Sequence, residues 1–135
     1  MGTLLLSLLL TQHGLQPQLR LAEVHVDAGP MLQQDAHQVL ARRRAAFRAC
    51  YTAAVYKDPS LSGRARLEVQ IPAHGRAESV EVERPEAWPQ ALEDCLERVV
   101  MQTRFAVPEG ASGVSRVRFD LHVWLEEGPP EPRTQ

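Results

Sequence analysis

Two cysteines, Cys50 and Cys95, are the residues of this chain whose chemistry depends most on where the protein resides. In an oxidising compartment two cysteines can form a disulfide, whereas buried free thiols behave as small apolar side chains. The chain contains no Cys-x-x-Cys motif, which argues against a redox-active pair. We expect a disulfide if the protein is exported and two buried thiols if it is not.

The other residue types that carry out catalysis or bind metals show no pattern. The histidines are scattered along the chain without the paired spacing of zinc ligands. They are His13, His25, His37, His74 and His122. No serine stands in a Gly-x-Ser-x-Gly context, and no glycine-rich phosphate loop is present. We therefore predict a non-enzymatic protein with no catalytic, cofactor-binding or metal site.

The composition is that of a single domain with few features of a nucleic-acid-binding protein. The 135 residues are 44% hydrophobic and 24% charged, which allows one domain with a sizeable core. A net charge of -2 and an aromatic content of 5% give no basic excess and few stacking platforms, so we expect no nucleic-acid partner. The arginine run 42–44 invites a nucleic-acid or lipid interpretation, but on the polar face of a helix it is typical of solvated surface.

The N-terminus contains an apolar run, Thr3 to Leu10, that is far shorter than the roughly 20 residues needed to span a bilayer. Its length matches the apolar part of an export signal, although no Lys or Arg precedes it and no Ala-x-Ala-like site follows it. It is either a signal whose basic start is missing or a native N-terminus. We expect an incomplete export signal and linker at 1–18, a single domain at 19–127 and a disordered tail at 128–135.

Hydrophobic periodicity predicts two helices and three strands, because apolar positions recur at helical spacing in two segments and alternate in three others. In chain order we predict a helix at 38–57, strands at 64–71 and 77–83, a helix at 89–102 and a strand at 114–125. A further short strand at 21–27, with Val24 and Val26 on one face, is a weaker prediction.

The α-β-β-α-β order predicts an α+β fold with a three-stranded sheet, at least partly antiparallel, and two helices packed on one face. Cys50 and Cys95 each lie on the apolar stripe of a predicted helix. Since both helices cover the same sheet face, the two thiols can be near each other, but the pattern alone does not prove that they are.

The last predicted strand is the longest, and one of its faces is polar. The outward residues are Arg116, Arg118, Asp120, His122 and Trp124. A solvated sheet face is the ordinary interpretation of such a pattern. The alternative is a contact surface, and we expect this strand to form an exposed sheet edge at which a partner strand pairs.

A different class of function uses the sheet face itself. If Arg66, Arg116 and Arg118 line a concave pocket, the protein is instead a small periplasmic ligand-binding or enzyme-accessory domain for anionic ligands. A shift of the unfolding temperature with anions distinguishes this alternative from an interaction module.

Three segments together carry a family resemblance: FRACYTAAVYKDPSLSGRARLEVQIPAHGRAESVEV, ALEDCLERVVMQTRFAVPEG and VRFDLHVWL. The matching positions are Cys50-Tyr51, Pro59, Leu61, Gly63, the turn at Gly75, Cys95, Phe105 and Pro108. Over residues 36–125 the chain resembles the AgmX/PglI C-terminal domain family, a TonB C-terminal-like group of bacterial envelope proteins. The resemblance implies a TonB-like fold, an envelope or periplasmic setting, a disulfide between the two helices and no enzymatic activity.

These observations predict a disulfide-stabilised, non-enzymatic protein-interaction module of the bacterial cell envelope. Its partners would be envelope proteins bound through a sheet edge. We expect contact with a membrane only by association or through an N-terminal anchor, and the oligomeric state stays open.

Overall fold

The computed structural model describes residues 14–127. The predicted apolar signal run at 3–10 and the predicted tail at 128–135 lie outside the described residues. The expected linker does not extend to residue 18, because the first strand, β1 (Leu15–Ala28), already begins at Leu15. The boundary between linker and domain that we predicted at 18/19 is therefore wrong for residues 15–18.

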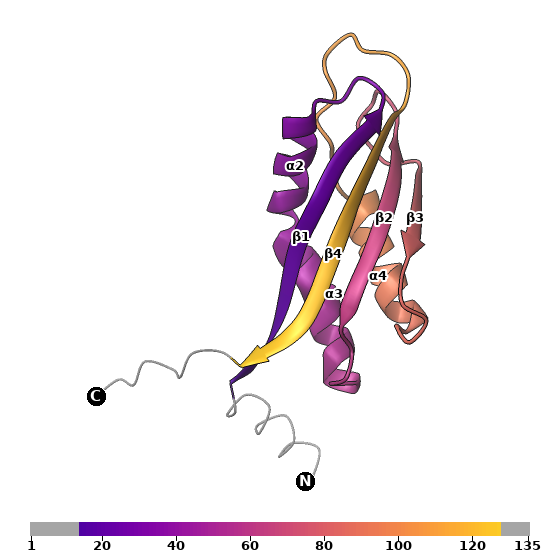
Figure 1. Ribbon diagram of the computed structural model, residues 1–135. Coiled ribbons are helices and arrows are strands. Elements are labelled where there is room, and N and C mark those ends of the chain that lie inside the picture. Colours follow the sequence, from indigo (N-terminus) through magenta and orange to yellow (C-terminus); the bar gives the residue numbers. More distant parts are fainter. Residues whose placement is uncertain (1–13, 128–135) are drawn as a thin grey trace, which may run out of the picture.

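One antiparallel sheet of four strands forms the front layer of the domain (Figure 1). After β1 come the strands β2 (Gly63–Ile71), β3 (Ser79–Glu83) and β4 (Ser115–Glu127), arranged in the order β1-β4-β2-β3. The helices α2 (Gln33–Arg42), α3 (Arg44–Lys57) and α4 (Gln90–Met101) all cover the same face of the sheet (Figure 1). The α+β class is confirmed. We predicted three strands and two helices, whereas residues 14–127 contain four strands and three helices.

The short strand expected at 21–27 forms part of β1, whose full length was difficult to predict because its side-chain alternation changes partway. Leu19 and Val24 are both buried, although an odd and an even position should point to opposite faces of a regular strand. A register shift against β4 between Ala22 and His25 accounts for this, and Glu23 within it has a φ of 54°. Such a bulge inserts one residue and returns the later valines to the core side.

The first predicted helix is two helices separated at Arg43. The backbone of Arg43 has φ -93° and ψ 2°, and its N–H donates to Leu40 O instead of continuing the α-helical pattern. Leu40 and Phe47, on either side of the break, are both fully buried. Because their spacing of seven fits two turns of an unbroken helix, the apolar pattern does not reveal the break.

The core lies between the inward side of the sheet and the apolar stripes of the helices. Four alternate residues of β2 are fully buried, namely Ala65, Leu67, Val69 and Ile71. The inward residues of β4 continue this layer, and the rings of Phe47 on α3 and Phe119 on β4 lie 5.9 Å apart. The alternating and helical patterns in the sequence therefore mark the true core.

The turn from β1 to α2 is held against the start of β4. Ser115 Oγ accepts a hydrogen bond of 3.0 Å from Met31 N, and both residues are buried. Gly29 in this turn has a φ of +93°, and a Cβ at this position would lie 2.3 Å from Ser115 Cα. Only glycine permits so close a backbone approach in this conformation.

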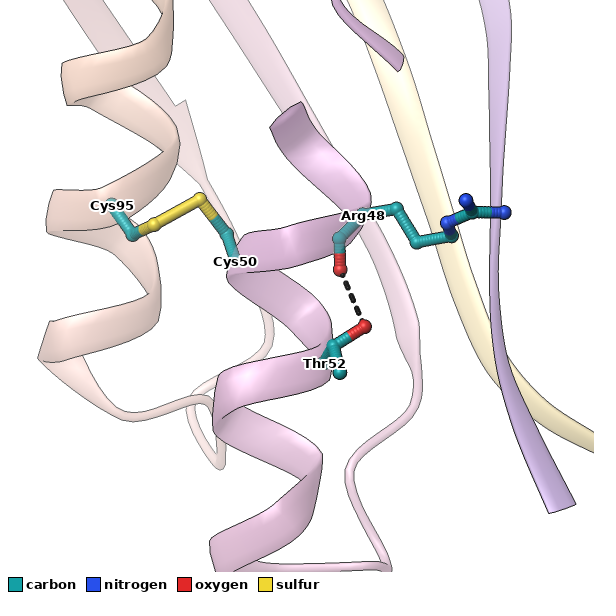
Figure 2. The surroundings of a disulfide bond; sticks show 4 residues. All are labelled: Arg48, Cys50, Thr52 and Cys95. Atoms are coloured by element: carbon teal, nitrogen blue, oxygen red, sulfur yellow. Dashed lines mark hydrogen bonds between the residues drawn. A yellow bond between two sulfur atoms is a disulfide. The ribbon is translucent and has the colours of Figure 1, made fainter. Parts of the chain in front are cut away.

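A disulfide joins Cys50 on α3 to Cys95 on α4, with an S–S distance of 2.07 Å and a Cα–Cα distance of 5.7 Å (Figure 2). The expected pairing of the two cysteines is therefore confirmed. Figure 2 shows Arg48 and Thr52 directed away from the disulfide; Thr52 Oγ1 donates to Arg48 O at 2.9 Å. A disulfide between two helices is characteristic of an oxidising, extracytoplasmic compartment. None of the helices within residues 14–127 has both the length and the apolar character needed to cross a membrane.

Candidate functional site

The strand that we expected at the sheet edge lies inside the sheet. β4 pairs with β1 from Leu15↔Glu127 onward and with β2 from Gly63↔Val123 onward, so neighbouring strands flank it on both sides. The edge geometry predicted for the residues 116, 118, 120, 122 and 124 is therefore wrong, because β1 occupies the position we assigned to a partner. Whether their outward side chains contact a partner stays a prediction.

Those outward side chains belong to a polar sheet face crossed by ion pairs. Arg66 Nε lies 3.1 Å from Asp120 Oδ1, and the Asp120 side chain is only 3% exposed. A further pair joins Arg118 Nε to Asp27 Oδ2 at 3.0 Å. Together with a looser contact of 3.5 Å between Arg116 and Glu68, these pairs connect β1, β4 and β2 but not β3.

The Arg118–Asp27 contact is exposed to solvent but well formed. Arg118 donates from Nε and Nη2 to the two carboxylate oxygens of Asp27 at 3.0 and 3.3 Å. This hydrogen bonding lowers the pKa of Asp27 below its ordinary value and raises the pKa of Arg118. Arg116 also lowers the pKa of Asp27 through its charge. The contact thus joins the outer faces of β4 and β1.

A shallow pocket of about 250 Å³ opens on the same face, near β3. Its lining residues are Arg64, Arg66, Glu83, Arg84 and Asp120. We predicted an anion pocket lined by Arg66 together with two arginines of β4. Arg66 does line this pocket, but Arg116 and Arg118 do not, since their guanidinium groups are directed to Glu68 and Asp27.

Arg84 forms one wall of the pocket and holds the connection from β3 to α4. Its Nε donates to Glu93 Oε1 at 2.7 Å and its Nη1 to Trp88 O at 2.7 Å, while Nη2 reaches Gln90 Oε1 at 3.2 Å. Trp88 is buried and donates its indole N–H to Ser62 O at 3.0 Å. This network places Arg84 beside the beginning of β2, next to Ser62.

Replacing Glu93 with Gln should make the protein less sensitive to acid. The hydrogen bond from Arg84, followed by that from Gln90, lowers the pKa of Glu93 in the folded state. A lowered pKa contributes stability that is present above the unfolded value of 4.5 and lost as the pH falls through the folded pKa. We expect Glu93→Gln to cost on the order of 1 kcal/mol at pH 7, with the difference from wild type narrowing toward pH 3 in urea unfolding.

Glu97 on the same helix is the matched control, because its pKa is raised by burial first and then by Glu93 and Asp94. Its ionised form is disfavoured in the folded state, so Glu97→Gln should be neutral or stabilising at pH 7. Parallel pH profiles for wild type and the Glu93 variant would contradict the assignment of the ion pair to stability.

A row of basic residues runs across the same sheet face beside the pocket. Arg20 of β1 and Arg64 of β2 are the cross-strand neighbours of His122 on β4. The His122 ring packs against Trp124, with ring centroids 4.8 Å apart. Within residues 14–127 neither Arg20 nor Arg64 forms an ion pair, unlike the other arginines of this face. Arg20 and Arg64 lie on opposite sides of β4, and His122 separates their charges.

The outer edge of β1, which pairs with no other strand within residues 14–127, is partly occupied by a side chain of α2. The N–H of Val26 donates to Gln33 Oε1 at 2.8 Å, and Gln33 Nε2 donates to Val24 O. The primary amide thus makes the donor and acceptor contacts that a neighbouring strand would make. This cap reaches only the C-terminal part of β1 and leaves Leu15 to Ala22 at the edge of the sheet.

The second edge strand, β3, offers less room for a partner. It has 5 residues, compared with 14 in β1. Its outward positions include Glu81 and Glu83, both exposed. Short strands and charged side chains are the means by which proteins protect sheet edges from unwanted pairing.

Periodicity alone did not single out Gln33, Arg64, Glu83 and Arg84. Arg64 and Arg66 share the outward face of β2, so the sequence indicated that Arg64 points outward. Nothing in the sequence, however, shows that it lies beside His122. Gln33 was hidden because its role depends on the path of β1, which the bulge obscured. Only the strand register shows which of these side chains lie close together.

Within the described part of the chain, no three His, Cys, Asp or Glu side chains gather closely enough to hold a metal ion. No family model matches the chain, and no match was found among curated proteins or solved structures.

Proposed function

We propose that this protein is a non-enzymatic interaction module of the bacterial cell envelope that pairs an extended segment of a partner protein with the outer edge of β1. The partner segment adds a fifth strand to the sheet along residues 15–22. The backbone supplies the affinity in this mode of binding, and the side chains at the edge supply the selectivity.

The single observation that carries this proposal is the contact of Gln33 with β1. Its amide occupies Val24 O and Val26 N, which shows that backbone groups on this edge point outward and accept partners. Residues 15–22 continue the same edge beyond the reach of that amide. Because unpaired backbone groups on a long edge are a template for another strand, this segment is suited to a protein partner.

The composition of residues 15–22 limits how a partner can dock. Pro17 lacks an N–H, so any ladder is interrupted at this residue, and proline in a sheet is tolerated at an edge. Arg20 is exposed and lies where an acidic side chain of the partner would meet it. We therefore expect an extended partner segment with an acidic residue opposite Arg20.

The cellular setting rests on the disulfide and on the family resemblance. An inter-helix disulfide suits an oxidising compartment. The apolar run at 3–10 suits an export signal, and the resemblance to the AgmX/PglI C-terminal domain family suits the bacterial envelope, with the periplasm as the oxidising space. These three lines support the same location, although the disulfide and the resemblance both depend on Cys50 and Cys95.

Site-specific photo-crosslinking tests the proposal. A photoreactive amino acid at Gln16 or Arg20, both exposed on β1, should capture one discrete partner in intact host cells. The same group at Glu81 on the opposite edge, or at Arg48 on α3, is the matched control and should capture none. Capture from Glu81 or Arg48 alone would refute pairing at β1.

Hydrogen exchange on the purified complex then separates strand pairing from mere proximity. Backbone amides of β1 between 15 and 22 that exchange quickly in the free protein should become protected when the captured partner binds. Protection confined to residues 79–83, or absent throughout, would exclude an added strand at β1.

A further inference from the structure

The pocket beside β3 and the basic row next to it make up one continuous area of the outer sheet face. Arg64 belongs to both, since it lines the pocket and is the cross-strand neighbour of His122. The pocket end of this area is distinct from the β1 edge, because Arg64 and Arg66 belong to β2 and act through side chains rather than backbone groups.

Arg66 is held in position at the floor of the pocket. Its Nε donates to Asp120 Oδ1 at 3.1 Å, and the buried carboxylate fixes the direction of the guanidinium. The Arg66 side chain is nevertheless 49% exposed, so its terminal nitrogens remain accessible from the pocket. A guanidinium that a protein carboxylate already holds in place loses less conformational freedom when it binds a ligand.

Arg84 is held at the opposite wall in the same way, through Glu93 and Trp88 O. Its hydrogen-bonding nitrogens are engaged, and it contributes positive charge rather than donors. Arg64 has no ion-pair partner within residues 14–127, which leaves its guanidinium available to a ligand. The one acidic group of the pocket without an ion pair in that range is Glu83.

We propose that this pocket binds the oxyanion group, a carboxylate or a phosphate, of a small soluble molecule, with Arg64 and Arg66 as its principal donors. Planar guanidinium groups match both kinds of oxyanion and bind them with paired hydrogen bonds. The volume of about 250 Å³ accommodates a small ligand and is below the range of drug-sized sites. Arg20, on the other side of His122, adds positive charge to the same face, and Glu83 opposes binding.

The test is a titration of the full-length, oxidised protein with inorganic phosphate and, separately, with citrate, followed by NMR of backbone amides and arginine Nε–H groups. Sodium chloride keeps the ionic strength constant, so that general screening does not change. We expect saturable shifts at Arg64 and Arg66. Tighter binding of phosphate or of citrate then identifies which oxyanion the pocket prefers.

Three variants separate a built site from a general charge effect. Arg64→Gln should weaken binding about tenfold, which corresponds to the loss of one charge-assisted hydrogen bond. Arg116→Gln removes the same charge from the same face outside the pocket and should change the affinity by less than about twofold. Glu83→Gln should strengthen binding by a few-fold because it removes a repelling carboxylate.

Shifts that never saturate, or an equal loss in the Arg64 and Arg116 variants, would refute the site. Weaker binding in the Glu83 variant would refute the assignment of a simple oxyanion, because that carboxylate would then be a ligand-binding group. Since Arg64 is exposed, its variant should unfold within a few degrees of wild type, which keeps the comparison valid. Partner capture at Gln16 should be unaffected by Arg64→Gln, so the two proposals can fail separately.

Discussion

Replacing Cys50 and Cys95 together with alanine should lower the free energy of unfolding by about 4 kcal/mol. The disulfide closes a loop between residues 45 positions apart, and the chain-entropy treatment of such a loop gives a stabilisation of that size. Alanine is the suitable replacement, because Cys50 is buried and serine would place an unpaired hydroxyl there. Urea unfolding at pH 7 measures the loss.

Two controls distinguish the cross-link from the loss of two side chains. Wild-type protein treated with a reductant keeps both thiols and should lose a similar amount of stability. The unfolded state expands once the cross-link is absent, so the dependence of the unfolding free energy on urea should also become steeper. A loss below about 1 kcal/mol in both forms would show that the disulfide does not restrict the unfolded chain.

Replacing Phe119 with alanine should cost about 4 kcal/mol, within the range of 3–5 kcal/mol measured for buried aromatic truncations. Phe119 is fully buried at the centre of β4, and its ring lies 5.9 Å from that of Phe47 at an interplanar angle of 51°. The truncation removes the apolar contact between sheet and helix and leaves a cavity that a four-stranded sheet and α3 cannot close without moving.

Trp124→Ala is the matched control, because Trp124 is an aromatic residue on the outward side of the same strand. It is half-buried against His122 and should cost about 1 kcal/mol or less. A comparison of Phe47→Leu, Phe119→Leu and the double variant should show a coupling of about 1 kcal/mol between the two rings. Equal losses for the Phe119 and Trp124 alanine variants would contradict the assignment of the core face.

An inter-helix disulfide and a central aromatic pair together explain how a small domain can keep a polar sheet face exposed. Both act on the helix side of the sheet, between α3 and its neighbours. The outer face is therefore free to carry charge, including Arg20 and Arg64, which form no ion pair within residues 14–127. The buried contacts and the proposed oxyanion pocket therefore lie on opposite faces of one sheet.

The two proposed sites also differ in what they require from the fold. An added strand at β1 needs an accessible backbone edge, and Gln33 restricts that edge at one end. An oxyanion in the pocket needs side chains held in register across β2 and β4, which the buried Asp120 provides for Arg66. The added strand at β1 therefore depends on the order of the strands in the sheet, and the oxyanion pocket depends on their register.

The sequence by itself determined most of the buried apolar residues in the elements we predicted, although the buried Asp120 was expected on the solvated face. Alternation in residues 64–71 and 114–125, and helical spacing in 89–102, marked core residues that the structure buries, such as Leu67, Val100 and Phe119. It also placed both cysteines on helices that cover one face, which made their pairing an expectation. Local periodicity records burial directly, because each element has its own repeat.

Tertiary structure alone decided where each strand lies in the sheet and which side chains meet across it. A strand with one buried and one solvated face has the same alternating pattern at the edge and in the centre of an antiparallel sheet. The pattern therefore could not show that β4 is central, that β1 is the edge or that Arg64 lies beside His122. Strand order and register arise from pairing between distant segments. A bulge at Glu23 interrupts the alternation of β1, so only its part at 21–27 was expected from the sequence.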